Sequence, residues 1–196
     1  TPGAIRNGDT GEVACDFYRR YAADLALAAD LGIDAFRFSV AWTRVVPEGG
    51  RRVNERGLDF YDRLVDELLA RSLEPVLTLY HWDLPVALED AGGWPARRTV
   101  DAFVHFAEAV VERLGDRVRY WITQNEPRVP GWLGYGTGEH APGRRSRADA
   151  LAAVHHLLLA HARAVPASRA GAPDARVGIS IDPTLAVPAT CRLADV

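Results

Sequence analysis

Four stretches of the chain carry apolar residues at the spacing of an amphipathic helix. Residues 16–31, 55–72, 99–114 and roughly 147–165 each place apolar side chains three and four residues apart. Gly32 directly follows the first stretch and is a typical helix stop. After each stretch comes a short run rich in β-branched and aromatic residues: "AFRFSVAW", "EPVLTLYHW", "RVRYWITQN" and "ARVGISID". The pattern therefore predicts a helix followed by a strand, four times over.

The predicted strands are close to continuous apolar runs rather than alternating ones. Such runs indicate strands buried on both faces, as in a parallel sheet covered by helices. This leaves two α/β architectures, a doubly wound open sheet and a (β/α)8 barrel. No Gly-rich phosphate loop follows any of the strands, so the dinucleotide-binding open sheet lacks its usual sequence support.

The polar residues favour the barrel, because they gather where each predicted strand ends. The carboxyl ends of the strands form the active-site face of a (β/α)8 barrel. In chain order the strand-end residues are Arg37, Ser39, Trp42, Tyr80, His81, Trp82, Asp83, Gln124, Asn125, Glu126 and Asp182. A complete barrel needs eight strands and roughly 250 residues. We therefore expect residues 1–196 to form a single partial TIM-barrel domain, truncated at both ends, with about four parallel strands and flanking helices.

Composition and charge point to a small-molecule partner. The formal net charge is only −3 and basic residues form no run, which argues against nucleic acid and anionic membrane surfaces as partners. No apolar stretch approaches the roughly 20 residues of a membrane span, and no signal peptide is visible. Cys15 and Cys191 are too few for a disulfide framework, so we expect buried, reduced thiols and a cytoplasmic location.

The motif "TQNEP" places a carboxylate directly after a strand. Glu126 is followed by Pro127, which cannot continue a ladder and which favours an extended backbone at Glu126. A carboxylic acid beside aromatic walls and partly removed from water can serve as a general acid. The alternative interpretation is a carboxylate that caps the next helix or pairs with an arginine.

Four motifs, taken together, resemble the β-glucosidases of glycoside hydrolase family 1. They are "FRFSVAWTRVVPEG", "LTLYHWDLPVALEDAGGW", "WITQNEP" and "LGYGTGEHAPG", and the similarity extends over nearly the whole chain. The resemblance implies strands 2 to 5 of the family barrel and a retaining mechanism on terminal β-linked glucosides. That mechanism uses two carboxylates roughly 5 Å apart, one acid/base and one nucleophile.

The resemblance also implies roles for five residues. Glu126 matches the acid/base, and Asn125 matches the residue that binds the 2-hydroxyl of the sugar. His81 and Trp82 match the wall of the first sugar subsite, and Arg37 resembles the arginine that bonds to the nucleophile and keeps it ionised. Each residue also has a purely structural interpretation. His81 could be a core histidine, Trp82 a packing aromatic, and Arg37 a member of an internal ion pair.

Parts of the family pattern are absent or changed. The Glu-Asn-Gly motif that carries the family's nucleophile does not occur in the 196 residues, so we expect this chain to be inactive alone. Gln124 stands where the family usually has Phe, and Arg128 stands where many members have Trp on the leaving-group side. Arg128 suggests an altered or an anionic leaving group, unless both changes are tolerated drift. Unpaired end strands and an uncovered inner face also predict low solubility.

No metal or organic cofactor is implied, because both steps of the retaining mechanism use carboxylates and water. His155, His156 and His161 do not share the face that a helical zinc pair uses, so we expect them to be structural or exposed. Two alternatives remain open: another retaining barrel glycosidase with Asn-Glu after its fourth strand, and a non-catalytic or decayed sugar-binding protein. The sequence leaves open glucose, galactose or a 6-phospho-sugar as the preferred sugar, and it leaves the oligomeric state unassigned.

Overall fold

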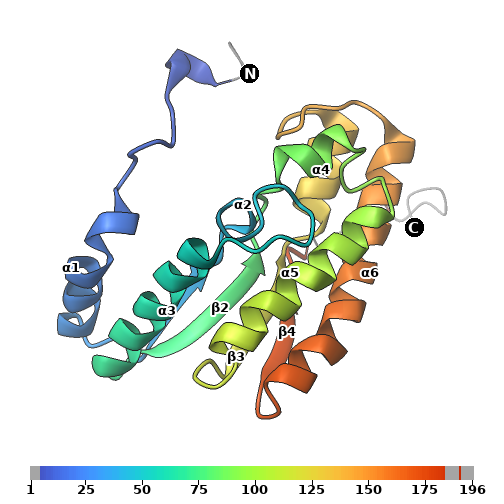
Figure 1. Ribbon diagram of the computed structural model, residues 1–196. Coiled ribbons are helices and arrows are strands. Elements are labelled where there is room, and N and C mark those ends of the chain that lie inside the picture. Colours follow the sequence, from blue (N-terminus) through green and yellow to red (C-terminus); the bar gives the residue numbers. More distant parts are fainter. Residues whose placement is uncertain (1–4, 184–189, 191–196) are drawn as a thin grey trace.

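The sheet consists of four parallel strands. The computed structural model describes residues 5–183 and Thr190. The strands β1 (Ala35–Ser39), β2 (Glu74–Tyr80), β3 (Tyr120–Asn125) and β4 (Arg176–Ser180) lie side by side in chain order (Figure 1). All three pairings are parallel, with an irregularity in the β3–β4 register between Ile122 and Asn125. The predicted partial barrel of parallel strands is confirmed.

Four long helices precede the strands, as the apolar spacing predicts. They are α1 (Phe17–Asp30), α3 (Glu55–Ala70), α5 (Arg98–Leu114) and α6 (Arg147–Gly171). The last helix continues past Pro166, beyond the predicted end. The short elements were not predicted, because they span too few residues to show a period in their apolar positions. These are η1 (Arg6–Gly8), α2 (Trp42–Val45), α4 (Val86–Asp90) and the π-helix η2 (Val129–Thr137).

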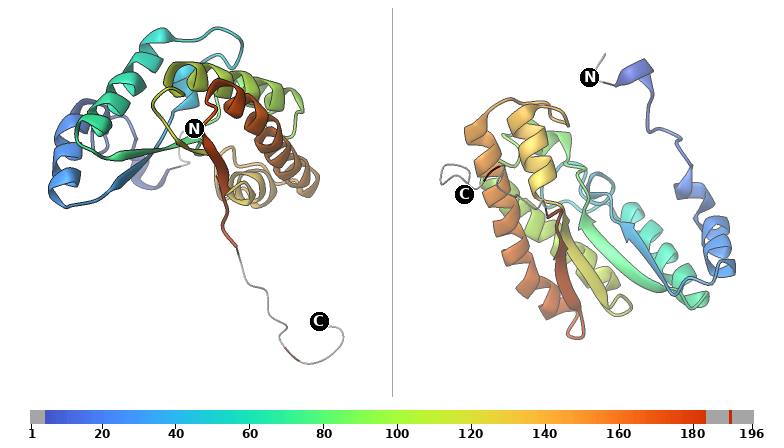
Figure 2. Two further views of the ribbon diagram at one scale, coloured as in Figure 1. Left: turned by 90° about the horizontal axis from the view of Figure 1, so that it is seen from below. Right: turned by 180° about the vertical axis from the view of Figure 1, so that it is seen from behind.

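The helices α3, α5 and α6 cover one face of the sheet (Figures 1 and 2). Within the described residues the opposite face of β1 is open, because Ala35, Arg37 and Ser39 are exposed while Phe38 is buried. Burial on both faces is therefore a wrong prediction for β1. A helix layer on one side alone produces the alternation that a half-covered strand shows.

Five aromatic side chains fill the core near the start of α5. The Trp42 ring centroid lies 5.2–6.2 Å from those of four others, which together with it form the aromatic core cluster. The members are Trp42, Tyr80, Trp94, Phe103 and Phe106. The Trp94 indole donates to the Tyr80 hydroxyl at 3.0 Å. Two of the strand-end aromatics predicted from the sequence thus belong to the core rather than to the open face.

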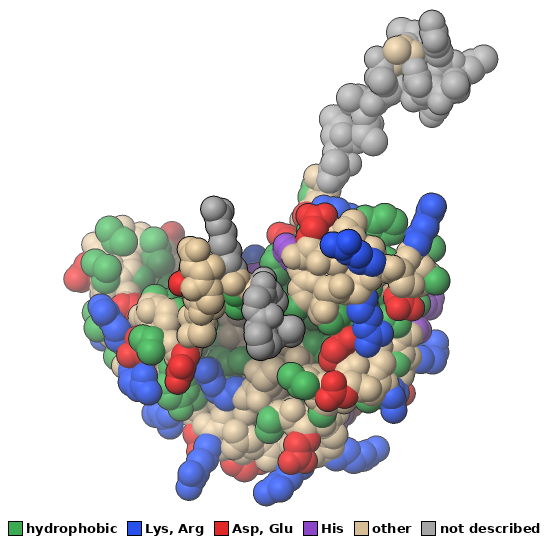
Figure 3. All heavy atoms as spheres, turned by 90° about the horizontal axis from the view of Figure 1, so that it is seen from above, with side chains coloured by type: hydrophobic (Ala, Val, Ile, Leu, Met, Phe, Trp, Pro, Cys, Tyr) green, Lys and Arg blue, Asp and Glu red, His purple; other side chains and the backbone are tan. Residues whose placement is uncertain are grey.

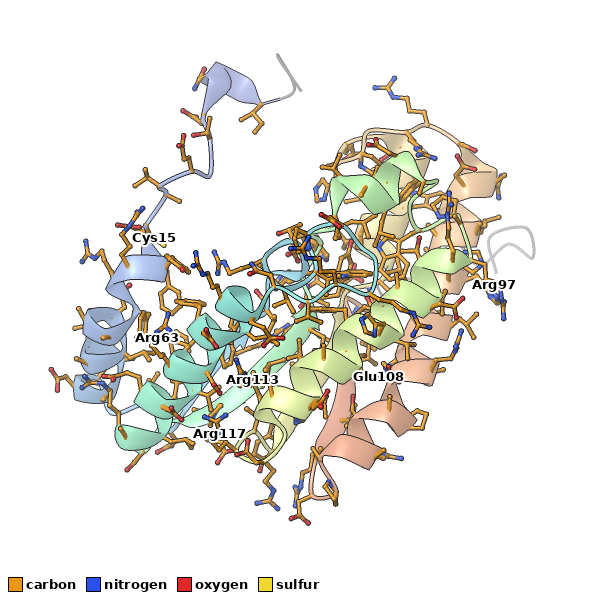
Figure 4. All side chains as sticks on the ribbon, viewed as in Figure 1. Cys15, Arg63, Arg97, Glu108, Arg113 and Arg117 are labelled. Carbon is orange, nitrogen blue, oxygen red and sulfur yellow. The ribbon has the colours of Figure 1, made fainter. Side chains whose placement is uncertain are left out.

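Ion pairs at the surface join α3 to α5 and to the turn that follows α5. Arg113 contacts Asp59 at 2.5 Å, and Arg117 contacts Asp62 at 2.5 Å and Asp66 at 2.6 Å. Both arginines lie between the two helices in Figure 4. Asp62 is shared, because it also lies 3.5 Å from Arg113, and the resulting network stabilises more than isolated surface pairs do.

Cys15 is exposed, which corrects the prediction of a buried thiol. It belongs to an N-terminal segment that leaves the sheet and its helices (Figure 4), so no core is available to bury it. Cys191 lies outside the described residues. Across the described chain, every helix is too short or too polar to cross a membrane.

Candidate active site

Glu126 directly follows β3 and has a left-handed backbone. Its φ is +48°, so the extended conformation predicted from Pro127 is wrong. The chain turns here, because Glu126 N–H donates to the Ser180 carbonyl at 2.8 Å and the Glu126 carbonyl accepts from Val129 N–H at 2.8 Å. A left-handed backbone at a residue other than glycine is strained by roughly 1–3 kcal/mol and is concentrated at functional sites.

Arg37 and Asn125 bridge the open face from β1 to β3. The Arg37 Nη2 donates to Asn125 Oδ1 at 2.6 Å, and its Nε donates to Thr78 Oγ1 at 3.0 Å. Both partners are neutral, and among the described residues no carboxylate pairs with Arg37. Because Oδ1 already accepts a charged donor, the Asn125 NH₂ group is left to donate elsewhere.

Trp82 and His81 form a turn at the end of β2. Trp82 has a φ of +82°, and its indole N–H donates to the Asn125 carbonyl at 2.9 Å. That bond occupies the N–H, so a ligand can meet only the ring of this residue, which is 37% exposed. Its centroid lies 5.2 Å from the His81 ring. Both residues are exposed in this structure.

The charges around His81 act in opposite directions. Partial desolvation lowers the pKa of His81, the positive charge of Arg37 lowers it further, and the Glu126 carboxylate raises it. The net effect is a lowered pKa, which favours the neutral imidazole. A neutral imidazole has one donor and one acceptor and can therefore bond a sugar hydroxyl in either sense.

Asp83 directly follows the turn formed by His81 and Trp82. The sequence predicted only that it lies at a strand end and assigned it no specific role. Burial raises the pKa of Asp83 to about 6, although the backbone N–H groups of Trp42, Thr43 and His81 pull it down. Its Oδ2 atom is buried and has no hydrogen-bond partner within the described residues.

Gln124 and Arg128, the two residues that differ from the family pattern, have different surroundings. Gln124 is fully buried, and neither of its amide atoms finds a hydrogen-bond partner within the described residues. Arg128 is exposed and donates from Nε to Asp182 Oδ2 at 3.0 Å and from Nη2 to the same oxygen.

A second set of contacts holds the loops beside Trp82, and sequence reasoning missed it. Tyr135 donates to Glu89 Oε2 at 2.5 Å, and Arg144 contacts Glu89 Oε1 at 2.6 Å. Gly93 has a φ of +67°, and a Cβ there would lie 2.2 Å from Glu89 Oε2, so only glycine fits. The Gly-Gly pair at 92 and 93 was the available signal.

His140 was also missed as a site residue, although it lies in one of the quoted motifs. Its ring centroid is 5.7 Å from that of Trp82, which brings the "GEHAPG" stretch beside the turn at the end of β2. The strand-end argument could not find it, because it comes from a loop.

Of the three histidines of α6, two lie within hydrogen-bond distance of other residues and one is exposed to solvent. His156 Nδ1 lies 2.9 Å from the Trp94 carbonyl, and His161 Nδ1 lies 2.6 Å from Thr123 Oγ1. His155 is exposed. In the described part of the chain, no group of three His, Cys, Asp or Glu side chains is placed to hold a metal ion.

Figure 3 shows the end of the molecule toward which the strands run. Charged side chains are spread around its periphery, and hydrophobic side chains appear nearer the middle. Asn125 is the last residue of β3, His81 and Glu126 directly follow β2 and β3, and Arg37 is the middle residue of β1, from which its side chain reaches Asn125. A polar ligand at this end would meet donors, acceptors and an indole face together, which is the usual composition of a small-molecule site.

Comparison with known proteins places these residues in a family. The model of glycosyl hydrolase family 1 matches residues 1–196. β-Glucosidase A of Thermotoga maritima is 47% identical over 196 residues, and thermostable β-glucosidase B of Thermobispora bispora is 52% identical over 185 residues. These alignments cover 100% and 94% of this chain.

A solved structure agrees in detail. The Thermotoga maritima β-glucosidase in complex with glucoimidazole superposes with a TM-score of 0.95 at 47% identity, covering 100% of this chain and 44% of that one. The chain also spans only 44% of the length of β-glucosidase A and 38% of that of β-glucosidase B. By sequence over its whole length and by fold, the chain belongs to glycosyl hydrolase family 1.

Proposed function

We propose that the protein is a retaining β-glucosidase that hydrolyses terminal β-linked glucosides, with Glu126 as its general acid/base. The observation that carries this proposal is the bridge from Arg37 to Asn125 beside Glu126, with His81 and Trp82 at the same strand ends. The family relatives named β-glucosidases support the reaction, and the glucoimidazole complex of one of them supports a sugar ligand.

In the first step, Glu126 donates its proton to the glycosidic oxygen as that bond breaks. A second carboxylate attacks the anomeric carbon and forms the glycosyl-enzyme intermediate. Glu126, now ionised, takes a proton from water, and the resulting attack on the anomeric carbon releases the sugar with retained configuration. The nucleophile would come from outside the 196 residues, so we expect this chain by itself to show no turnover.

The neighbouring groups have matching tasks in this proposal. The NH₂ group of Asn125, held by Arg37, donates to the 2-hydroxyl, a contact that strengthens as positive charge develops on the ring. His81 bonds another hydroxyl, and the Trp82 ring face packs against the apolar face of the sugar. Arg37 retains further N–H groups with which it can keep the nucleophile ionised.

Two further predictions, on the extent of the domain and on its cellular location, accompany this function. Residues 1–196 are proposed to act as one partial-barrel domain whose inner face is completed by the rest of the protein. A cytoplasmic location stays a prediction, for which a free thiol at Cys15 is compatible with a reducing compartment.

The test measures release of nitrophenol from 4-nitrophenyl β-glucoside by the full gene product. We expect Glu126→Ala to lower turnover by about 10²–10⁴-fold, since it removes the general acid/base. Azide should restore part of the activity, because it attacks the glycosyl-enzyme without base assistance and yields a β-glucosyl azide. The matched control is Glu108→Ala, an exposed glutamate on α5, which should leave turnover unchanged.

Three outcomes would overturn the proposal. Saturable glucose binding without turnover by the unaltered protein would identify a sugar-binding protein instead. Full activity in Glu126→Ala would remove its assigned role. Release of α-glucose as the first product would contradict the retaining mechanism.

A further inference from the structure

Strand β3 carries one extra residue beside β4. The two strands are in register at Ile122 and Gly178, and again at Asn125 and Ser180. Between these two pairs the chain advances from 122 to 125 on β3 but only from 178 to 180 on β4, which is the count of a β-bulge. The bulge lies directly before Glu126, whose N–H donates to the Ser180 carbonyl at 2.8 Å.

The bulge changes the face of the sheet to which the side chains of β3 point. In a regular strand, residues two positions apart point to the same face. Thr123 Oγ1 lies 2.6 Å from Nδ1 of His161, which belongs to α6 in the helix layer (Figures 1 and 2). Asn125 Oδ1 instead accepts from Arg37, which is exposed on the open face. The extra residue therefore brings Asn125 to the face of the candidate site.

Two hydrogen bonds hold the Thr123 side chain, which is fully buried. Besides its contact with His161, the hydroxyl donates to the Gly178 carbonyl of β4 at 3.3 Å. A hydroxyl has a single proton and a carbonyl only accepts, so both bonds form together when His161 Nδ1 carries a proton and donates to Thr123 Oγ1. The resulting chain of bonds runs from α6 through Thr123 to β4 and fixes Thr123 on the helix side.

The bulge is thus held from both faces of the sheet. Without the extra residue, Thr123 and Asn125 would share one face, and either Thr123 would leave His161 or Asn125 would leave Arg37. When the His161 bond is lost, only the bond from Arg37 opposes a shift of the extra residue along β3. Asn125, and Glu126 directly after it, then lose their fixed orientation.

We propose that His161 and Thr123 are positioning residues, which act through the bulge of β3 to hold Asn125 toward the 2-hydroxyl of the sugar. This inference rests on the proposed function, in which Asn125 donates to that hydroxyl. Both residues act from the side of the sheet that faces the helices, so neither touches the sugar. The structural role expected for His161 from the sequence thereby extends to the candidate site.

The test measures kcat/KM of the full gene product for 4-nitrophenyl β-glucoside and for its 2-deoxy analogue. The two substrates differ only in the hydroxyl assigned to Asn125, so the ratio of their kcat/KM values reports how well Asn125 is placed. This ratio does not depend on the fraction of folded protein. Thr123→Val keeps the shape of the side chain but removes its hydroxyl, and it should lower the ratio about 10-fold, the equivalent of one hydrogen bond. His161→Phe should lower the ratio to a similar extent.

Further variants separate a positioning role from a purely structural one. Thr123→Ser keeps the hydroxyl and should restore the ratio of the unaltered protein. The double variant Thr123→Val/His161→Phe should lower the ratio no further than either single variant, because the two residues act through one bond. The matched control is His156→Phe on the same helix. His156 Nδ1 lies 2.9 Å from the carbonyl of Trp94, in the aromatic core cluster rather than in β3, so the ratio should stay unchanged.

The outcomes distinguish this inference from the proposed function. An equal fall in kcat/KM for both substrates in Thr123→Val and His161→Phe, which leaves the ratio unchanged, would overturn the inference. So would an equal fall of the ratio in His156→Phe. In either case, hydrolysis of the glucoside by the unaltered protein would still uphold the proposed function. Hydrolysis of neither substrate by the unaltered protein would refute both.

Discussion

The aromatic core cluster and the strand-end site are built from neighbouring residues but have opposite character. Tyr80 is buried and accepts a hydrogen bond from Trp94, whereas His81, the next residue, is exposed and lies near two charged groups. Backbone strain follows the same division, since Trp82 and Glu126 have positive φ angles. One region gains stability from close packing, and the other keeps polar groups available for a ligand at some cost in stability.

The comparison predicts that the two regions respond differently to truncation. Phe106→Ala should lower the free energy of unfolding by about 3–5 kcal/mol, because Phe106 is fully buried and stacks on Trp42 at 5.2 Å. His81→Ala should change it by less than about 1 kcal/mol, because His81 is exposed. Urea unfolding of the full gene product measures both values.

Activity should reverse this order. In the proposed function, His81→Ala lowers kcat/KM for a β-glucoside by about 10-fold or more, since one hydroxyl loses its partner. Folded Phe106→Ala should keep kcat/KM close to that of the unaltered protein. Comparable losses of stability in the two variants would remove the distinction between the regions.

Sequence periodicity predicted the long elements well and the local geometry less well. The four helix–strand units follow from apolar spacing, and the strand-end rule selected Arg37 and Asn125, which the structure joins by a hydrogen bond. The same rule also selected Trp42 and Tyr80, because position along the chain does not distinguish a side chain in the core from one on the open face. The turn at Glu126 depends on its bond to Ser180, more than 50 residues away, which no local preference of Pro127 can include.

Asp83 stands at the border of the two regions and should make stability depend on pH. Its pKa is raised to about 6 by burial, against a usual 3.8. Folding therefore binds a proton between about pH 4 and 6, so the carboxyl contributes stability at low pH that is lost as pH rises through 6. A shift of this size corresponds to about 3 kcal/mol.

Asp83→Asn isolates this effect, because asparagine keeps the shape but cannot ionise. The free energy of unfolding of the unaltered protein, minus that of the variant, should decrease by about 3 kcal/mol between pH 4 and pH 7. Urea unfolding at half-unit steps of pH measures the difference. A difference that stays constant or increases would show that the Trp42, Thr43 and His81 N–H groups outweigh burial.

Gln124 is a polar residue in the core, and its replacement should have the smallest effect on the free energy of unfolding. The side chain is 0% exposed, and its amide nitrogen and oxygen lack partners within the described residues. Gln124→Leu keeps a similar volume and removes the desolvated amide, so it should raise the free energy of unfolding by about 1–2 kcal/mol. A loss of stability would mean that the amide is satisfied by a group such as a buried water. Because Asn125 and Glu126 follow directly, kcat/KM should also be measured, and a fall exceeding 10-fold would show that Gln124 positions them.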